Sequence, residues 1–368
     1  MIIAFYKLNT NSKKYVIIKK NIFRKDFFME KYISEVKTPK ISIAPMVDKT
    51  HRHFRYFSRI LTKDALLYTE MLTANSIIHG DRDKLLFFRE EEGPVALQIA
   101  ASNPEDAYKA VKLAEDYKYT EINLNCGCPS DRVSGNLMGA ALMSSKDLVY
   151  EILLAMKEAT KKPITIKHRI GIDGTDILEG YSNKIIMEGY DDLLEFLDTV
   201  SKAKPDRYTI HARSAILKGL SPKENREIPK LDYDMVYRLK KEFDYLNIEI
   251  NGGFKTLNSI KDALSKVDGV MIGRASYEDC YLLANLHKIY KDKEHLDPIS
   301  RADIIKNYIP YILEELNNGT SIHSLISPLH TLLKGQSGSN KYKQLLSSSN
   351  IKKETIVDTL NYILNNLL

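Results

Sequence analysis

Short apolar runs alternate with longer stretches of helical periodicity along most of this chain. From Lys40 onward, runs of β-favouring residues fit buried strands at residues 41–44, 66–68, 95–99, 121–125, 164–167, 207–210, 247–250 and 270–272. Between most of them lie stretches with apolar residues three and four positions apart, often begun by Ser, Thr or Asp caps, such as residues 104–117, 145–159, 191–200, 234–243 and 256–265. Eight strands alternating with helices over about 240 residues predict a (β/α)8 TIM barrel. A doubly wound sheet is the alternative, but no GxGxxG follows an early strand.

The pattern becomes wholly helical after about Pro298. Helical stretches are expected at residues 302–317, 323–333 and 351–367, with loops at residues 318–319 and 335–338. We therefore predict an N-terminal extension over residues 1–39, a barrel over 40–298 and a small all-helical domain over 299–368. The long loop at residues 171–190 is typical of a functional surface loop.

Composition and charge narrow the class of protein. At 368 residues and 43% hydrophobic, the chain can bury a large core and a smaller one. No apolar run approaches the roughly 20 residues of a membrane span. Three cysteines and no signal peptide are typical of a reducing cytoplasm.

The net charge of +6 comes from the N-terminal tail. Residues 1–40 hold ten Lys/Arg and three Asp/Glu, which leaves about −1 for the rest. The charge is therefore no sign of nucleic-acid binding, and any RNA contact must come from local patches. Residues 1–28 are expected to be a disordered or partly stranded extension; a targeting presequence or a start at Met29 are the alternatives.

A thiol stands where the fourth predicted strand ends. Gly127-Cys128-Pro129 stops the strand, because proline has no N–H for a sheet and glycine permits a sharp turn. Cys126 fits a small buried hydrophobe, whereas a loop between glycine and proline is a poor place to bury Cys128. A metal site does not fit, because Cys126 and Cys128 form a CxC, Cys280 is far along the chain and no histidine lies at ligand spacing from them. A disulfide framework needs more cysteines in a shorter secreted chain.

Strand ends of a barrel converge on one pocket, so their residues form a candidate site. They are Pro45, Met46, Gln98, Asn125, Cys128, Lys167, Arg169, His211, Arg213, Asn251, Gly252, Gly253, Gly273 and Arg274. Glycines at the last two ends would let backbone N–H groups approach a phosphate; a plain tight turn is the alternative for Gly252-Gly253. Lys167 is either a snorkelling surface lysine or a buried cation that requires an anionic partner. His211 is either a satisfied barrel histidine or a cofactor ligand.

Six motifs, in chain order, closely resemble those of the tRNA-dihydrouridine synthase family, A-type branch: IAPMVDKTHRHFR, NLNCGCPSDRVSGNLMGAALM, TIKHRIGID, IHARSAILKGLSPKENREIP, INGGFK and GVMIGRASYED. The resemblance covers about residues 40 to 345. It implies that flavin mononucleotide (FMN) is held by Pro45, Met46, Gln98, Lys167, His211, Asn251, Gly252, Gly253, Gly273 and Arg274.

The resemblance also implies a reaction. NADPH reduces FMN, hydride passes to C6 of a uracil ring in tRNA, and Cys128 donates a proton to C5 from the opposite face. A free thiol, with a pKa of about 8.5, is mostly protonated at neutral pH and suits a general acid. The branch suggests positions 20 and 20a of the D-loop, and Asn125 is expected to orient the base.

A flipped nucleotide needs a positively lined entrance. The expected tRNA contacts are Asn125, Arg132, Arg213, Lys223, Arg226 and Lys343, and Lys218 is equally well explained as a solvated charge. The branch usually carries arginines where this chain has Asn340 and Lys343, so the bidentate fork is lost there. No metal, membrane or protein partner is expected. A small-molecule FMN barrel enzyme of the dihydroorotate dehydrogenase kind and a catalytically silent RNA-binding barrel are the alternatives.

Overall fold

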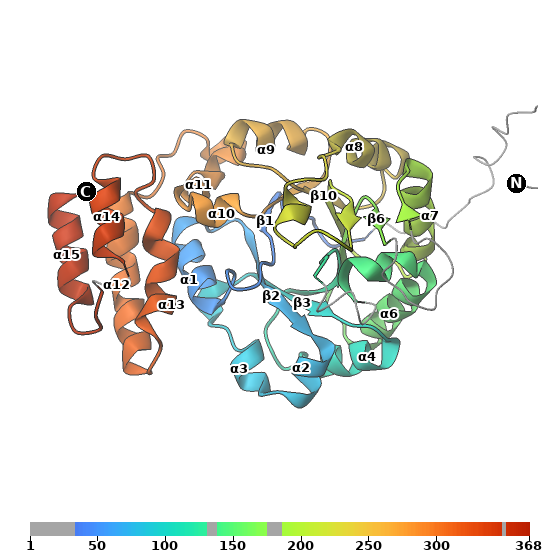
Figure 1. Cartoon of the computed structure of the whole chain (residues 1–368), viewed down its shortest axis with the longest axis horizontal. Coiled ribbons are helices and arrows are strands. Elements are labelled where there is room, and N and C mark those ends of the chain that lie inside the picture. The colour runs from blue at the N-terminus through green and yellow to red at the C-terminus, as the bar shows by residue number, and fades with distance from the viewer. Residues whose placement is uncertain (1–33, 131–137, 175–185, 348–350) are drawn as a thin grey trace, which may run out of the picture. The chain divides into compact units, whose positions relative to one another are not determined.

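The predicted closed barrel is present in the structure, a computed structural model that describes residues 34–130, 138–174, 186–347 and 351–368. All eight neighbouring pairs are parallel. The strands lie inside a ring of helices (Figure 1). In their order around the cylinder the strands are β1 Ile41–Ile43, β11 Gly269–Ile272, β10 Ile248–Asn251, β8 Tyr208–His211, β5 Ile164–Arg169, β4 Glu121–Cys126, β3 Val95–Ala100 and β2 Leu66–Thr73. The TIM-barrel prediction is confirmed. The doubly wound alternative is wrong, because the sheet closes on itself.

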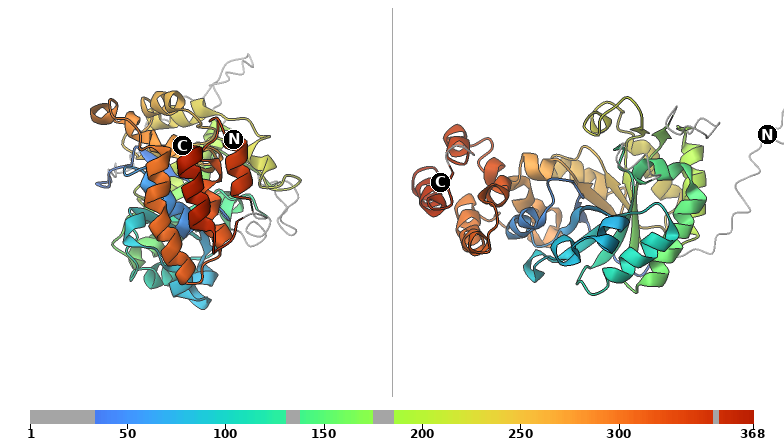
Figure 2. Two further views of the ribbon diagram at one scale, coloured as in Figure 1. Left: turned by 90° about the vertical axis from the view of Figure 1, so that its left-hand side faces the viewer. Right: turned by 60° about the horizontal axis from the view of Figure 1, so that its bottom comes forward.

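Helices surround the strands (Figure 2). They are α1 Arg52–Leu61, α2 Ala74–His79, α3 Arg82–Leu86, α4 Pro104–Leu113, α6 Lys146–Ala159, α7 Tyr190–Ser201, α8 Tyr233–Glu242, α9 Leu257–Leu264, α10 Ala275–Glu278 and α11 Tyr281–Ala284. Local chemistry sets where they begin: the Asn103 side chain caps α4 ahead of Pro104, and Thr256 caps α9. The predicted helix at residues 104–117 ends early, since residues 114–117 form turns.

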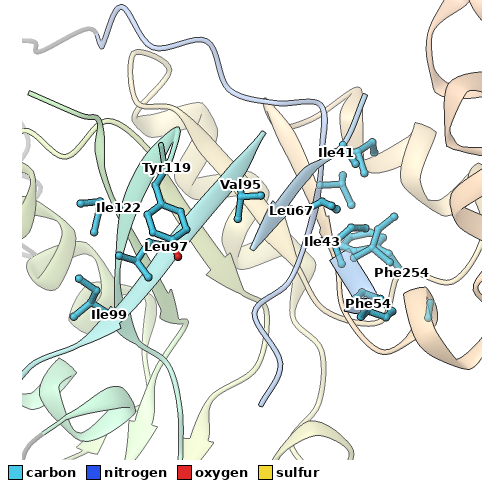
Figure 3. Close-up of a cluster of buried hydrophobic side chains, with 14 of the residues drawn as sticks. Ile41, Ile43, Phe54, Leu67, Val95, Leu97, Ile99, Tyr119, Ile122 and Phe254 are labelled. Atoms are coloured by element: carbon cyan, nitrogen blue, oxygen red, sulfur yellow. The ribbon is translucent and has the colours of Figure 1, made fainter. Parts of the chain in front are cut away.

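Residues that alternate along the strands divide the barrel into two environments. One set faces the helices and builds the main core, including Ile41, Leu67, Leu97 and Ile122 (Figure 3). Each fully buried aliphatic side chain there contributes roughly 1.5–3 kcal/mol. The other set faces the barrel interior, where the apolar members Ala44, Leu66, Tyr68, Ala96 and Met271 form a separate small cluster.

A small second sheet, which the sequence did not predict, joins two of the loops above the barrel. β6 Ile172–Asp173 pairs with β7 Ile186–Met187 antiparallel and with β9 Ala215–Ile216 parallel. It ties the segment after β5 to the segment after β8. Much of the predicted long loop, residues 175–185, lies outside the described residues.

Helices follow the barrel, as predicted: α12 Arg301–Asn317, α13 Ile322–Ile326, α14 Ser339–Leu345 and α15 Ile356–Asn366. Only the first part of the predicted helix at 323–333 is α-helical; Ser327–Thr331 is a 3-10 helix. Helix α14 was not predicted, and its buried residue is Tyr342. The domain boundaries at residues 39 and 298 stay predictions.

Aromatic and ionic contacts hold α12 against the barrel. The ring of Tyr311 stacks on Tyr56 of α1 with centroids 3.7 Å apart. Arg52 and Arg89 of the barrel both pair with the buried carboxylate of Glu315, at 2.6 and 2.7 Å. Helix α12 is therefore fixed to α1 by a packed and charge-compensated contact.

Candidate active site

Cys128 lies in the loop that follows β4 and is partly exposed, whereas Cys126 inside the strand is fully buried. It packs beside Ala100 and Met138. Its sulfur lies within electrostatic range of Lys167 and Arg169 on the neighbouring strand β5, although burial lowers the pKa of both cations overall. The structure thus brings the predicted thiol and lysine together at the carboxyl end of the barrel.

Hydrogen bonds hold the backbone around Cys128 on both sides. The side-chain oxygen of Asn125 accepts from the N–H groups of Gly127 and Cys128, each at 3.1 Å. The carbonyl of Cys128 accepts from Ala140 N–H at 2.8 Å. Asn125 therefore shapes the turn that presents the thiol, a role additional to the predicted contact with the base.

Arg169 binds three loops at once and was not assigned a role from the sequence. Its guanidinium donates to the carbonyls of Gly127, Ser214 and Asn225, at 2.9, 2.9 and 3.2 Å. Burial, foremost, lowers its pKa to about 10, so it stays charged at neutral pH. The signal in the sequence was an arginine two residues after Lys167, on the same face of the strand.

Lys167 is a cation without a matching anion. Its ammonium donates to the side-chain oxygen of Asn251 at 3.2 Å, and no carboxylate of the described residues lies within ion-pair distance. Burial, followed by the charge of Arg169, lowers its pKa to about 8, although Glu249 and Cys128 act in the opposite direction. Lys167 keeps part of its surface exposed, so an anionic ligand can reach its ammonium, and a largely buried ammonium without a carboxylate partner among the described residues favours such a ligand.

Replacing Lys167 with methionine is expected to stabilise the protein without cofactor by about 2 kcal/mol at pH 7, because an unpaired buried charge is removed. The pKa falls from 10.5 in the unfolded chain to about 8 in the folded one. The unfolded state therefore binds more protons between these values, and the cost of burying Lys167 is full below pH 8 and disappears toward pH 10.5.

Urea unfolding of wild type and Lys167→Met at pH 7 and pH 10 measures this difference. The gain should shrink at pH 10, and Lys167→Arg, which keeps the charge, should show no gain. Equal stability of the methionine variant and wild type at pH 7 would contradict the assignment of an uncompensated cation.

Gly252 and Gly253 adopt backbone angles that other residues rarely take, with φ of +126° and +75°. A Cβ on Gly252 would come within 2.8 Å of Leu231, and one on Gly253 within 2.7 Å of the same side chain. The hydroxyl of Tyr233 donates to the Gly252 carbonyl at 2.6 Å. The turn after β10 therefore requires glycine for its own geometry, and it leaves the backbone accessible, since Gly253 is exposed.

His211 lies against this turn at the end of β8 and is uncharged at neutral pH. Its pKa is lowered well below 6.5, first by burial and then by the positive charges of Arg169, Lys167, Arg213 and Arg226. These four cations surround one uncharged histidine, so the mouth of the barrel carries an excess of positive charge. Such a site attracts phosphate and other anions.

The arginines at the rim are largely engaged with protein groups. Arg274 pairs with Glu227 at 2.7 Å, and Arg213 donates to the carbonyls of Glu227 and Pro229. Both therefore hold the loop after β9 in place. Lys223 and Arg226 on that loop are exposed, and so is Lys343 on α14. Arg132 lies outside the described residues.

The other predicted contacts lie at the strand ends. Pro45 and Met46 follow β1, and Met46 packs on the interior cluster. Gly273 follows β11 and is partly exposed. Gln98 on β3 is buried and accepts from the Asn125 amide at 2.8 Å. In the described ranges no helix could cross a membrane, and no group of three or more His, Cys, Asp or Glu side chains could hold a metal.

Fold and site together define a (β/α)8-barrel enzyme with a cysteine and a buried lysine at its mouth. Comparison with known families places it further. The chain belongs to the dihydrouridine synthase family, because the family model described as Dihydrouridine synthase (Dus) matches residues 42–367. The resemblance inferred from the six motifs is confirmed.

Similar proteins agree with the family. The chain is 46% identical over 323 residues to the tRNA-dihydrouridine(20/20a) synthase of Synechocystis sp., covering 88% of this chain and 93% of that protein. It is 43% identical over 327 residues to the protein of the same name from Vibrio vulnificus, with 88% and 96% covered. A third, from Shigella flexneri, is 42% identical over 328 residues, with 88% and 92% covered.

Proposed function

We propose that this protein reduces uridine to 5,6-dihydrouridine in the D-loop of tRNA, at positions 20 and 20a, with FMN as cofactor and NADPH as reductant. The observation that supports this most is the thiol of Cys128 beside the buried Lys167 at the mouth of a barrel of the dihydrouridine synthase family. The relatives named tRNA-dihydrouridine(20/20a) synthase support the choice of uridine positions.

The residues at the strand ends fit FMN. Lys167 offers a cation without a carboxylate partner among the described residues, which suits the electron-rich pyrimidine edge of a reduced flavin. The backbone at the ends of the last two strands suits a phosphate. Gly253 is exposed there, and Gly252, Gly273 and the Arg274 N–H lie beside it. Pro45, Met46, Gln98, His211 and Asn251 would complete the contacts. When bound and reduced by NADPH, FMN supplies the hydride for C6 of uracil.

Cys128 holds the proton that C5 receives. Asn125 and Arg169 hold the backbone of the turn that carries the thiol. Lys167 and Arg169 beside it stabilise negative charge that develops as the thiol gives up its proton. The three cysteines are free thiols, which suits the reducing cytoplasm proposed as the compartment.

The target base must leave its stack to reach the barrel mouth. Lys223 and Arg226 are exposed at the rim and Lys343 is exposed on α14; these cations would contact the tRNA backbone. Arg213 and Arg274 would act by holding the rim loop, with Arg132 an additional candidate. The second N–H of Asn125 is a donor for the flipped base.

The test uses the full chain with FMN, NADPH and an unmodified tRNA transcript. Mass spectrometry of the digested tRNA is expected to show two hydrogens added at positions 20 and 20a, and none added without NADPH. Transcripts with cytidine at either position identify the target. Free orotate and uracil serve as controls. Their reduction in place of tRNA would contradict the proposal.

A further inference from the structure

We infer that Thr165 and Asn123, inside the barrel, are positioning residues that orient Gln98 and the Cys128 turn through one directional chain of hydrogen bonds. The inference rests on the proposed roles of Cys128 and Gln98. The chain begins at the Glu121 carboxylate near the amino ends of the strands and finishes at the backbone of Cys128.

Five side chains on three adjacent strands form this chain. The hydroxyl of Thr165 donates to Glu121 at 3.1 Å, and the Asn123 amide donates to Thr165 at 2.8 Å. The Gln98 amide donates to the Asn123 oxygen at 2.8 Å. The Asn125 amide then donates to the Gln98 oxygen at 2.8 Å, and its own oxygen accepts from Gly127 and Cys128 N–H. All five side chains are at most 6% exposed.

The two ends of the chain permit only one direction. Backbone N–H groups can only donate, so the atom of Asn125 that faces them must be its oxygen. At the other end, the Thr165 oxygen accepts from the Asn123 amide, so the Thr165 hydrogen is left to donate to Glu121. Every amide between these ends is then fixed, because a flipped Asn123 or Gln98 would set N–H against N–H.

Two further donors face the oxygen of Glu121 that accepts from Thr165. The hydroxyl of Tyr68 donates to the same oxygen at 2.8 Å, and the guanidinium of Arg207 donates to it as well. Arg207 also lies 3.7 Å from Glu249. Three donors therefore converge on this one oxygen, which makes it the acceptor at this end of the chain.

Because the orientations of the Gln98 and Asn125 amides are fixed, the groups that each presents to a ligand are known. Each side-chain amide has two hydrogens, and Gln98 and Asn125 each give one to a described residue. The second N–H of each is left to donate, the Asn125 oxygen already accepts twice, and the Gln98 oxygen accepts once. Gln98 therefore presents an N–H donor to the flavin and Asn125 an N–H donor to the base.

Thr165→Val tests the chain because valine keeps the shape of threonine and removes only the hydroxyl. The Asn123 amide then loses its acceptor and can regain one only by moving away from Gln98. Thr165→Ser restores the hydroxyl. Thr209→Val is the matched control: Thr209 is equally buried on β8 and donates to the other interior carboxylate, Glu249, at 2.6 Å, but it has no place in the chain.

Two measurements on the full chain are compared with wild type: FMN Kd of the cofactor-free protein by flavin fluorescence, and single-turnover reduction of tRNA at saturating FMN. Thr165→Val is expected to raise the Kd about threefold or more and to slow reduction about tenfold. Thr165→Ser and Thr209→Val should stay within about threefold of wild type. The midpoint temperature of thermal unfolding should fall by the same amount in Thr165→Val and Thr209→Val.

An unchanged rate and Kd in Thr165→Val, or equal losses in Thr165→Val and Thr209→Val, would overturn the inference. Thr165→Ala gives the same test if the valine variant does not fold. Cys128→Ala in the same assay distinguishes failure of the proposed catalytic role of Cys128 from failure of the positioning chain. Full turnover there refutes the role of Cys128, whereas an inactive Cys128→Ala beside a fully active Thr165→Val refutes only the positioning chain.

Discussion

Replacing Cys128 with alanine is expected to leave FMN bound and to slow dihydrouridine formation by about 100-fold or more, since a positioned general acid contributes 10²–10⁴. The side chain lies at the strand end beside Lys167, but it makes no hydrogen bond to the proposed flavin-holding groups in the described residues. The flavin spectrum of the purified variant and its single-turnover rate with tRNA measure the two effects separately.

Cys126→Ala is the matched control, because it removes a thiol only two residues away, at the end of β4. Cys126 is fully buried in the main core and faces the helices. Its loss should cost about 1 kcal/mol of stability and leave the rate unchanged. Equal rates for Cys128→Ala and wild type would contradict the acid role.

Replacing Arg207 with methionine is expected to lower the free energy of unfolding by about 3–5 kcal/mol, the usual cost of breaking a buried ion pair. Arg207 is 1% exposed and is the shared partner of Glu121 and Glu249 inside the barrel. Removing it leaves two buried carboxylates without a compensating charge. Urea unfolding measures the change.

The destabilisation in Arg207→Met should be larger at pH 8 than at pH 5. Burial already raises the pKa of Glu249 in the wild type, and without Arg207 it rises further. The folded state then binds more protons than the unfolded one above the ordinary pKa of 4.5, so stability falls as pH rises. Lys109→Met, which breaks an exposed pair with Glu105, should cost under about 1 kcal/mol at both pH values. A loss of under about 1 kcal/mol in Arg207→Met would refute the conclusion that Arg207 compensates the buried charges of Glu121 and Glu249.

The strands were predictable because the alternation is strong on the helix-facing side. Ile122 and Leu124 mark β4 as plainly as Ile164 and Ile166 mark β5. The short helix α14 escaped prediction because only Tyr342 of its residues is buried. The sheet of β6, β7 and β9 escaped because two-residue strands carry no periodicity of their own.

The candidate residues at the strand ends followed from one rule, that strand ends converge, and their assignment to FMN followed from the family resemblance. Their partners could not follow from it. That Arg274 pairs with Glu227 and that Thr165 reaches Glu121 across neighbouring strands depend on how the barrel closes and on its register. Polar residues at alternate positions in Glu121–Cys126 indicated a hydrogen-bond network inside the barrel. They did not indicate which group donates and which accepts in each bond.

The most direct test of the central claim is the geometry of addition across the C5–C6 bond. Reduction of tRNA in D2O should place deuterium on both carbons, because the thiol and reduced flavin exchange their hydrogens with solvent. NMR coupling between the two remaining protons in the isolated dihydrouridine gives their relative orientation. If uracil lies between Cys128 and the flavin, the two deuterium atoms arrive from opposite faces and the addition is trans. A cis product would place the proton donor on the flavin side and contradict the role of Cys128.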